Sequence, residues 1–461
     1  MMFRNYTYIV FCSLHRLAKK LLRKQTKEQF RMVKISPNSF SENGKIDIKG
    51  PYINEIEIKN SALIDKENLF PIENIVDVGT NLYLKDSYQK QEKTKLKLGV
   101  HLKAAKVTWQ SFIDASLISK GYKNEGLSYT AYISDDINQW ALPSWIWTNA
   151  ALVRMYCKIG NIKKAKHISD LLIKQQLECG GWIVRNDYEP NGAIPTLAPN
   201  DSAYIANNAL IEVYKITNEK KYIEAAIKCA DWIIKTARED SLVWTGFDMK
   251  NEKWMQDHII VDTGFAAGLF ANLYEILGDI KYKQFLEKFI KQYIKLFYIK
   301  SKKGFCTSIN KNNKQGGGMF ARGQAWALEG LIPTYKVLKC NDVKKVIEET
   351  VNNLIKEQLP NGGWAYNFSK PLLGEDCKGV SVIAKSLMDW NKINNNHLIV
   401  NSTKKALEWC ANHTSQKDES KGGIFSFCME GAVVHNFYTS TAFVYSSAYA
   451  IETLELLNSN S

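Results

Sequence analysis

The sequence predicts an all-α protein, an (α/α)6 toroid of six helical hairpins preceded by an N-terminal extension. From about residue 98 onward, apolar residues recur with a period near 3.6, the period of an α-helix. The helices that this period predicts are of two alternating kinds, and the pair repeats about every 58 residues. With 461 residues, 45% of them hydrophobic and 23% charged, the chain can bury a sizeable core.

The N-terminal extension, residues 1–97, differs in texture from the rest of the chain. Residues 40–97 mix Asn, Gly and Pro with short alternating apolar runs, which indicates strands or an irregular segment. Residues 1–40 hold nine Lys and Arg against one Glu, a charge of +8, whereas the other 421 residues carry only +6. We therefore expect no nucleic-acid partner, while residues 1–40 could make peripheral contact with a membrane.

The cysteines and the first residues favour a cytoplasmic location. A short apolar run precedes the basic stretch in residues 6–25, the reverse of the order in a signal peptide. Nine cysteines are scattered along the chain, with no CxxC pair and no nearby histidine group. This spacing predicts neither disulfides nor a zinc site, and we expect no metal or other cofactor.

The segment 98–461 is expected to form one domain of twelve helices. Each helix is an amphipathic or apolar stretch bounded by a short polar loop. The predicted helices span about 101–117, 145–158, 162–177, 202–217, 220–237, 263–278, 281–298, 323–338, 342–358, 378–392, 400–413 and 440–457.

Six of these helices are rich in small residues and apolar nearly all round, whereas the others are charged on one face. The apolar helices begin near 149, 202, 263, 323, 379 and 441. A repeat of one buried and one half-exposed helix cannot bury its inner face alone and needs neighbours. Six such hairpins can close into a toroid with the apolar helices as its inner ring. An open solenoid is the alternative, and the lack of obvious capping repeats favours closure.

In a closed toroid the loops that lead into the inner helices converge at one mouth, where a ligand pocket is expected. These loops contain tryptophans, aspartates, an arginine and glycines, a set of residues suited to sugars. They read QWALPSWIWTN (139–149), GAIPTLAPND (192–201), WMQDHIIVD (254–262), GGGMFARGQ (316–324), LLGEDCKG (372–379) and VVHNFYTS (433–440).

Asp201 and Asp262 hold equivalent positions in consecutive repeats, 61 residues apart. Each could simply cap its helix, because aspartate is a preferred N-cap. Asp262, however, lies in the apolar stretch HIIVDTGF, where burial would raise the pKa of its carboxyl, and a second carboxyl nearby would raise it further. A general acid that works near neutral pH needs such a raised pKa. We therefore favour a catalytic pair.

Other residues of the mouth are candidates for ligand binding. Arg322 begins an inner helix among aromatic and small residues, and it either forms an ion pair with an aspartate of the mouth or binds an anionic ligand. Asp376 is a candidate cap or a group that orients the ligand. Trp145 and Trp147 could stack on a sugar ring, although tryptophans at helix junctions more often serve packing.

At these residues the chain resembles the six-hairpin glycosidases. The similarity spans about 130–457 and rests on NDSAYIANNALIEVY (200–214), IVDTGFAAGLFANLYEI (260–276), EDCKGVSVIAKSLMDW (375–390) and, most specifically, RGQAW (322–326). The sequence is similar to the unsaturated glucuronyl hydrolases of glycoside hydrolase family 88 and the unsaturated rhamnogalacturonyl hydrolases of family 105.

The resemblance implies a hydrolase of acidic oligosaccharides that hydrates a 4,5-unsaturated uronyl residue. Asp262 would protonate ring carbon C4 and help to deliver water to C5, and Asp201 would hold the ring hydroxyls. Arg322 and other mouth residues would bind the acidic sugar. By the same resemblance the substrate-binding residues are Trp145, Trp147, Asn200, His258, Arg322, Gln324, Trp326 and Asp376. Asn200 stands where the family usually has a histidine.

Two other functions suit the same toroid. A sugar 2-epimerase would need histidines as acid and base on inner helices, and only seven histidines occur in the whole chain. A non-catalytic saccharide-binding or polysaccharide-assembly protein would keep the pocket and lose the chemistry. The second is the main alternative to the hydrolase.

Overall fold

In the computed structural model of the chain, the helical part is described almost throughout and the N-terminal extension only in short pieces. The described residues are 31–33, 45–47, 55–59, 62–64, 69–71, 98–120, 124–133, 139–141, 145–184, 196–249, 251–255, 259–369, 375–416, 420–426 and 441–459.

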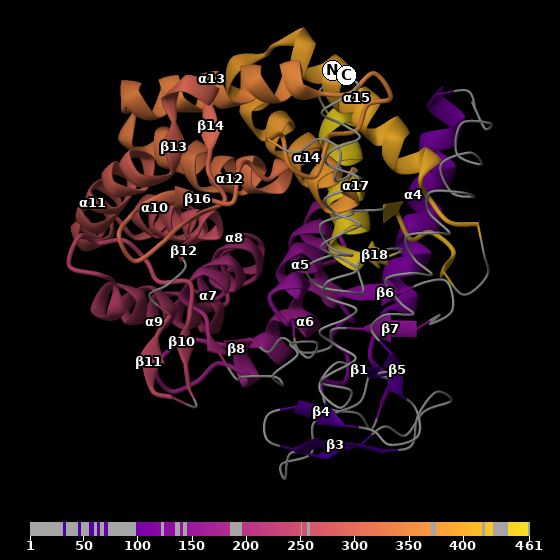
Figure 1. The fold of residues 1–461 in the computed structure, drawn as a ribbon, viewed down its shortest axis with the longest axis horizontal. Helices are drawn as coiled ribbons and strands as arrows, with labels where there is room; N and C mark the ends of the chain where they lie inside the picture. Colours follow the sequence, from indigo (N-terminus) through magenta and orange to yellow (C-terminus); the bar gives the residue numbers. More distant parts are fainter. Residues whose placement is uncertain are drawn as a thin grey trace.

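The described helices form two concentric rings (Figure 1). The inner ring consists of α5 (Thr148–Lys158), α7 (Pro199–Ile205) with its continuations η2 (Ala206–Ile211) and α8 (Glu212–Thr217), α10 (Phe265–Leu277), α12 (Ala321–Leu338), α14 (Cys377–Asn394) and α17 (Val444–Asn458). The outer ring consists of α4 (Leu98–Ala115), α6 (Ile162–Lys174), α9 (Lys220–Thr236), α11 (Ile280–Phe297), α13 (Asn341–Glu357) and α15 (His397–Asn412). The predicted (α/α)6 toroid is confirmed.

The ring is closed by contact between its first and last inner helices. Each inner helix packs on the next along the chain, and α17 packs on α5. The outer helix that covers α17 is α4, from the other end of the helical segment, and Lys106 of α4 pairs with Glu455 of α17 at 2.6 Å. The open solenoid is therefore wrong, because the helix that precedes the first repeat completes the last one.

Burial follows the two kinds of sequence. Helix α14 buries polar and apolar residues on every side, whereas outer helix α11 buries a stripe at helical spacing that includes Phe285, Phe289 and Tyr293. The opposite face of α11 carries its lysines. Inner helices can pack on three sides because their small residues allow close approach of neighbouring backbones.

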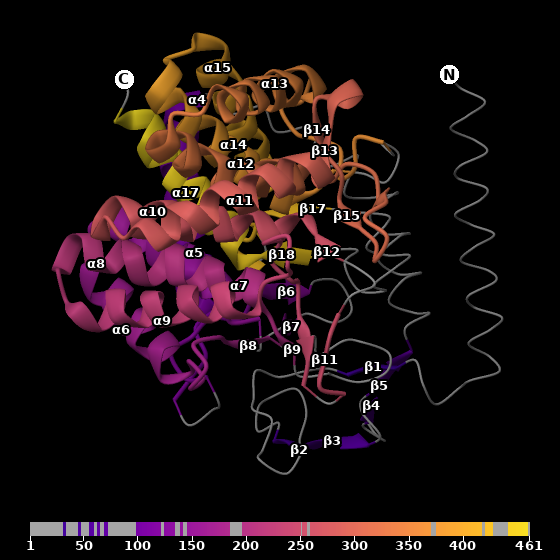
Figure 2. The same ribbon diagram turned by 90° about the vertical axis from the view of Figure 1, so that its left-hand side faces the viewer.

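Short antiparallel strands gather at one end of the toroid, where the chain leads into the inner helices (Figure 2). One sheet has the order β17-β18-β6-β7 (Phe425–Ser426, Thr441–Phe443, Ala131–Ile133, Gln139–Ala141), and another β11-β10-β9-β8 (Lys253–Trp254, Phe247–Asp248, Thr196–Leu197, Ile183–Val184). A third has the order β12-β15-β16 (Ile259–Ile260, Ser308–Ile309, Gln315–Gly316), and β13 pairs with β14 (Tyr298–Ile299, Gly304–Phe305).

Several predicted helix limits differ from the observed ones by about three residues, and two of these differences have a clear cause. The helix expected from residue 440 begins at Val444, because Thr441–Phe443 pair with Ala131–Ile133 as a strand. The helix expected from residue 202 begins at Pro199, since proline lacks an N–H and suits the first turn. That helix also contains a π-helical segment, Ala206–Ile211, which apolar periodicity does not reveal.

The described parts of the extension are five strands. β1 (Arg31–Val33) pairs with β5 (Leu69–Pro71), and β3 (Glu55–Lys59) pairs with β2 (Lys45–Asp47) and β4 (Ala62–Ile64). Most of residues 1–40 lie outside the described residues, so the membrane contact stays a prediction, as does the cytoplasmic location. Of the helices that the structure describes, none combines the length and apolarity needed to cross a bilayer.

Candidate active site

Asp201 and Asp262 lie at the same mouth, on neighbouring inner helices. Asp201 is in the first turn of α7, and Asp262 is in the 3-10 turn η3 (Val261–Gly264) that leads into α10. Neither carboxyl caps its helix, because the cap positions are Ala198 and Ile260 and no side-chain cap bond forms. The simpler capping interpretation therefore does not account for either aspartate.

The two carboxyls share an environment that favours their protonated forms. Burial raises the pKa of Asp262 to about 7, although the charge of Arg322 and the N–H of Asp262 itself act in the opposite direction. Burial also raises the pKa of Asp201 well above its ordinary value, and the negative charge of Asp262 raises it further. Both side chains keep a partly accessible surface at the mouth. Such a pair can hold and deliver a proton near neutral pH.

The turn that carries Asp262 is held from both sides. The hydroxyl of Tyr293 donates to the carbonyl of Val261 at 2.8 Å, and the Val261 N–H donates to the carbonyl of Thr307 at 2.9 Å. The hydroxyl of Thr263 donates to the carbonyl of Val243 at 2.7 Å. These bonds use backbone groups on both sides of Asp262, so the position of its carboxyl is set by the protein before substrate binds.

A close backbone approach fixes the same turn against α12. A Cβ atom built on Gly330 would lie 2.2 Å from the carbonyl oxygen of Gly264, closer than atoms can pack. Only glycine allows α12 to approach η3 at this distance.

Arg322 and Asp376 form an ion pair across the mouth. Nη1 of Arg322 donates to Oδ2 of Asp376 at 2.8 Å. The other carboxylate oxygen of Asp376 accepts from the backbone N–H of Lys378, so Asp376 also caps α14. The guanidinium lies over the rings of Phe320, Trp326 and Tyr366, at 4.8, 5.3 and 5.1 Å from their centroids. The ion pair and the cap were both among the alternatives that the sequence left open.

A second cation, Lys378, stands beside this pair. Its Nζ lies 3.9 Å from Asp376 and 4.5 Å from the centre of the Phe443 ring, and its side chain is 8% exposed. Arg322 and Lys378 therefore both lie beside Asp376, and two neighbouring cations on this side of the mouth suit an anionic group.

Two predicted ligand residues have buried polar atoms without a partner. Among the residues that the structure describes, Oδ1 of Asn200, next to Asp201, accepts no hydrogen bond, and Nε1 of Trp145 donates none. Buried polar atoms are rarely left unsatisfied in a folded protein. A sugar hydroxyl could satisfy each of them, so both residues remain candidates for substrate binding.

Trp147 and Trp326 form part of an aromatic layer beneath the mouth. The ring of Trp147 meets those of Tyr204 and Trp326 edge to face, and Phe265 contacts both Tyr204 and Trp326. Trp147 is 9% exposed and Trp326 5%. Packing therefore accounts for most of the surface of both rings, and they form the floor of the site.

Gln324, a predicted substrate-binding residue, has a carboxamide that is hydrogen-bonded within the protein, and its role in substrate binding stays a prediction. Its Oε1 accepts from the N–H of Phe305 at 2.7 Å, and its Nε2 donates to the carbonyls of Phe305 and Phe320 at 2.8 and 3.0 Å. Gln324 anchors the strand β14 to α12. His258, another predicted ligand residue, lies outside the described residues.

Sequence reasoning missed Lys378 and Tyr366, which complete the surroundings of Arg322. A signal for Lys378 was present, since a lysine in the first turn of a buried helix is opposed by the helix dipole and needs a partner. Tyr366 follows an outer helix and carries no comparable signal. Within the described part of the chain, no group of three His, Cys, Asp or Glu side chains could hold a metal ion.

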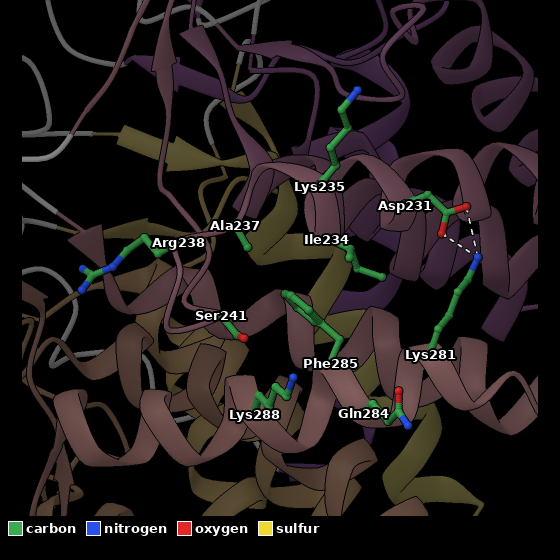
Figure 3. A pocket seen from close by; sticks show the side chains of 10 residues that line it. All are labelled: Asp231, Ile234, Lys235, Ala237, Arg238, Ser241, Lys281, Gln284, Phe285 and Lys288. Carbon is green, nitrogen blue, oxygen red and sulfur yellow. Dashed lines mark hydrogen bonds and ion pairs between the residues drawn. The ribbon is translucent and has the colours of Figure 1, made fainter.

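A groove on the outer surface does not include any of these residues. It lies between α9 and α11, has a volume of about 520 Å³ and is lined by Lys235, Arg238, Lys281 and Lys288 over Phe285 (Figure 3). Lys281 is paired with Asp231 at 2.9 Å. The groove holds one carboxylate, so it lacks the acid pair that defines the mouth.

A closed toroid with two acids, an arginine and aromatic rings at one mouth defines a carbohydrate-active enzyme of the six-hairpin glycosidase class. The family model described as Glycosyl Hydrolase Family 88 matches residues 127–455, and the chain belongs to this family. It is a glycoside hydrolase, and its substrate is an oligosaccharide. The family and fold indicated by RGQAW and the helical repeat are confirmed.

Solved structures with the same fold are distant in sequence. An unsaturated glucuronyl hydrolase specific for heparin superposes with a TM-score of 0.61 at 14% identity, covering 79% of this chain and 97% of that one. An unsaturated glucuronyl hydrolase from Bacillus sp. GL1 gives 0.60 at 13%, covering 77% and 96%. A possible family 105 member from Salmonella enterica gives 0.58 at 14%, covering 80% and 97%. No curated protein sequence matches the chain.

Proposed function

We propose that this glycoside hydrolase acts on oligosaccharides that end in a 4,5-unsaturated uronyl residue, and that it cleaves them by hydrating the enol ether. The observation that carries the proposal is the pair Asp201 and Asp262, whose carboxyls favour their protonated forms at the mouth. Hydration needs a proton donor at carbon, which a carboxyl with a pKa near neutral can be.

The reaction adds one water molecule in total. Asp262 transfers its proton to C4 of the C4=C5 double bond, and water adds to C5 and returns a proton to the carboxylate. The resulting hemiketal opens by breaking the bond between C5 and the ring oxygen, which gives a ketone at C5 and a hemiacetal at C1. The hemiacetal then expels the aglycone sugar. The distance rule for the two carboxyls of retaining and inverting glycosidases does not apply, because no nucleophile attacks C1.

Asp262 and Asp201 differ in their suitability as the proton donor. Arg322 counteracts the effect of burial on Asp262 and leaves its pKa at about 7, so Asp262 can both give and regain a proton at neutral pH. Burial and the negative charge of Asp262 raise the pKa of Asp201 well above its ordinary value, which favours its protonated form. In that form Asp201, next to Oδ1 of Asn200, would bind ring hydroxyls.

The acidic character of the proposed substrate rests on Arg322 and Lys378. Both cations lie beside Asp376, and Arg322 keeps 14% of its side chain accessible. A uronate carboxylate would bind to this pair of cations. The solved relatives support the same substrate class, since one is specific for heparin and another is responsible for the degradation of glycosaminoglycan.

The test uses purified full-length protein and a panel of unsaturated disaccharides made by polysaccharide lyases. We expect loss of the ultraviolet absorbance of the enol ether with at least one disaccharide, and no loss with Asp262→Asn. Asp231→Asn, on the outer surface, is the control for the same chemical change and should leave the rate unchanged. No loss with any disaccharide would overturn the hydration proposal, and binding without turnover would support the non-catalytic alternative.

A further inference from the structure

A second cavity opens at the opposite end of the inner ring. It has a volume of about 450 Å³ and is lined by residues from α5, η2, α8, α10, α12, α14 and α17. Volumes of roughly 300–1,000 Å³ are typical of small-molecule sites. We propose that this cavity is a separate binding site for a small neutral polyhydroxylated molecule of one or two sugar rings.

The cavity is separate from the candidate active site. Glu329, which lines it, follows Arg322 by seven residues on α12, and at 1.5 Å per residue this places it about 10 Å further along the axis. The aromatic layer of Trp147, Tyr204 and Trp326 lies between the two. A molecule bound at one end therefore does not pass through the ring to the other.

Two unsatisfied atoms of one buried ion pair identify where a ligand would bind. Oε1 of Glu329 accepts from Tyr449 at 2.7 Å and from Arg154 at 3.3 Å, and Lys385 lies 3.6 Å away, whereas Oε2 has no partner within the described part of the chain. Arg154 donates from Nε to Glu452 and from Nη1 to Asn208, whereas its Nη2 meets no acceptor among the described residues. The side chains of Arg154 and Glu329 are only 7% and 6% exposed.

An unpaired charged donor and acceptor of this kind are costly when buried. A hydroxyl can satisfy either atom, because it donates to a carboxylate and accepts from a guanidinium. A carboxylate or phosphate would satisfy Arg154 but would repel Glu329. The pair therefore selects for a hydroxylated ligand.

Two irregularities in the inner helices meet at this cavity. The π-helix η2 (Ala206–Ile211) carries Asn207 and Asn208, which both line it. Pro333 lies inside α12 and also lines the cavity. Because proline has no N–H, the backbone carbonyl of Glu329, four residues earlier, receives no helical hydrogen bond from Pro333. Such departures from α-helix lower stability and are frequent at functional sites.

The charge and apolar surface of the cavity agree with a neutral sugar. Six Lys and Arg side chains line it against five Asp and Glu, so the lining is close to neutral. Leu328 and Ile332 supply apolar surface for the C–H groups of a sugar ring. A strongly anionic or cationic ligand would find no matching excess of charge.

The binding test uses the full-length protein and four neutral probes: glucose, galactose, N-acetylglucosamine and lactose. Calorimetry and ligand-observed NMR should detect one bound molecule per chain for at least one probe at millimolar concentration. Arg154→Lys and Glu329→Gln should each weaken binding about tenfold or more, because each removes one of the two unpaired groups. Glu212→Gln, on the rim of the same cavity, is the matched control and should not change the affinity.

Arg154 and Glu329 are buried, so the variants Arg154→Lys and Glu329→Gln could fail to fold. A third variant keeps the test decisive in that case. Lys336→Trp changes an exposed residue of the rim and narrows the opening without altering the core, so it should also abolish binding. Binding that is lost in Asp262→Asn and kept in Lys336→Trp would place the sugar in the candidate active site and overturn the proposal. No binding of any probe, or binding of sulfate in its place, would overturn it as well.

Discussion

Arg322 donates from Nη1 to Oδ2 of Asp376 at 2.8 Å, and the same guanidinium lowers the pKa of Asp262 from the value that burial alone would give. One cation thus joins acids from two different repeats, one that caps α14 and one that precedes α10. Because Arg322 is buried under three aromatic rings, its charge acts at short range with little screening by water. Several predictions about the acid pair depend on this arrangement.

The rate of hydrolysis should fall as pH rises above about 7, because Asp262 must be protonated to donate. Replacing Arg322 by Met removes the charge that favours the ionised carboxyl, so the pKa of Asp262 should rise and the alkaline limb of kcat should move to higher pH. Steady-state rates at saturating substrate between pH 5 and pH 10 check this. Movement of the limb to lower pH would contradict the assigned electrostatics.

Asp262→Asn should stabilise the protein at alkaline pH. Between pH 3.8 and about 7 the folded chain keeps a proton on Asp262 that the unfolded chain releases, so wild type loses stability as pH rises through this range. Asparagine has no such titration, and the variant should gain about 1 to 4 kcal/mol at pH 8 and nothing near pH 3.5. Urea unfolding at the two pH values measures the difference, with Asp231→Asn as control.

Gly330→Ala should destabilise the fold and reduce activity together. The added Cβ would lie 2.2 Å from the carbonyl oxygen of Gly264, so α12 must move away from the turn that carries Asp262. Overpacking of this kind costs about 1 to 3 kcal/mol. Gly316→Ala is the control, since its nearest neighbour would be 3.7 Å away. Thermal unfolding and kcat are measured for both, and an unchanged Gly330→Ala enzyme would show that the contact is unimportant.

Gln324→Met should lower stability without a specific effect on substrate affinity. The substitution leaves the N–H and carbonyl of Phe305 without their partners, which costs about 1 to 3 kcal/mol for each buried group. KM should stay within about threefold of wild type once the folded fraction is corrected for. A large increase in KM at unchanged stability would return Gln324 to the substrate-binding residues.

Lys378→Met should weaken substrate binding more than catalysis. If Lys378 and Arg322 neutralise a uronate carboxylate, KM should rise about tenfold or more while kcat changes little, because the contact is equal in ground and transition states. Lys392→Met, an exposed lysine on the same helix that pairs with Asp389, is the control. Equal effects of the two substitutions would remove Lys378 from the binding site.

The helical repeat was the most predictable feature of this chain. The outer helices carry one apolar stripe and the inner helices are apolar on most sides, so their number, order and approximate limits follow from local residue patterns. One departure occurred where a backbone segment pairs with a distant strand. The strand Thr441–Phe443 needs Ala131–Ile133, more than 300 residues earlier, and no local pattern contains that partner.

The candidate acids were predictable in part. Equivalent positions in consecutive repeats indicated that Asp201 and Asp262 share a mouth, because a repeated fold brings equivalent residues to the same end. The motif RGQAW made Gln324 a candidate ligand residue, but it could not reveal that the carboxamide of Gln324 bonds to the backbone of Phe305. Lys378 was overlooked because its neighbours Asp376 and Phe443 come together only when α14 and α17 pack.

The sequence by itself determined the order of the helices, the repeat and the pair of aspartates, because helix periodicity and repeat position are local properties. Only the tertiary structure decided three features. These are closure of the ring by α4 and α17, the ion pair of Arg322 with Asp376, and the buried ion pair of Arg154 and Glu329, in which one atom of each side chain has no partner among the described residues. Each of these joins residues that are far apart in the chain. Their energies depend on burial and on distances between side chains, and these quantities exist only once the hairpins have packed.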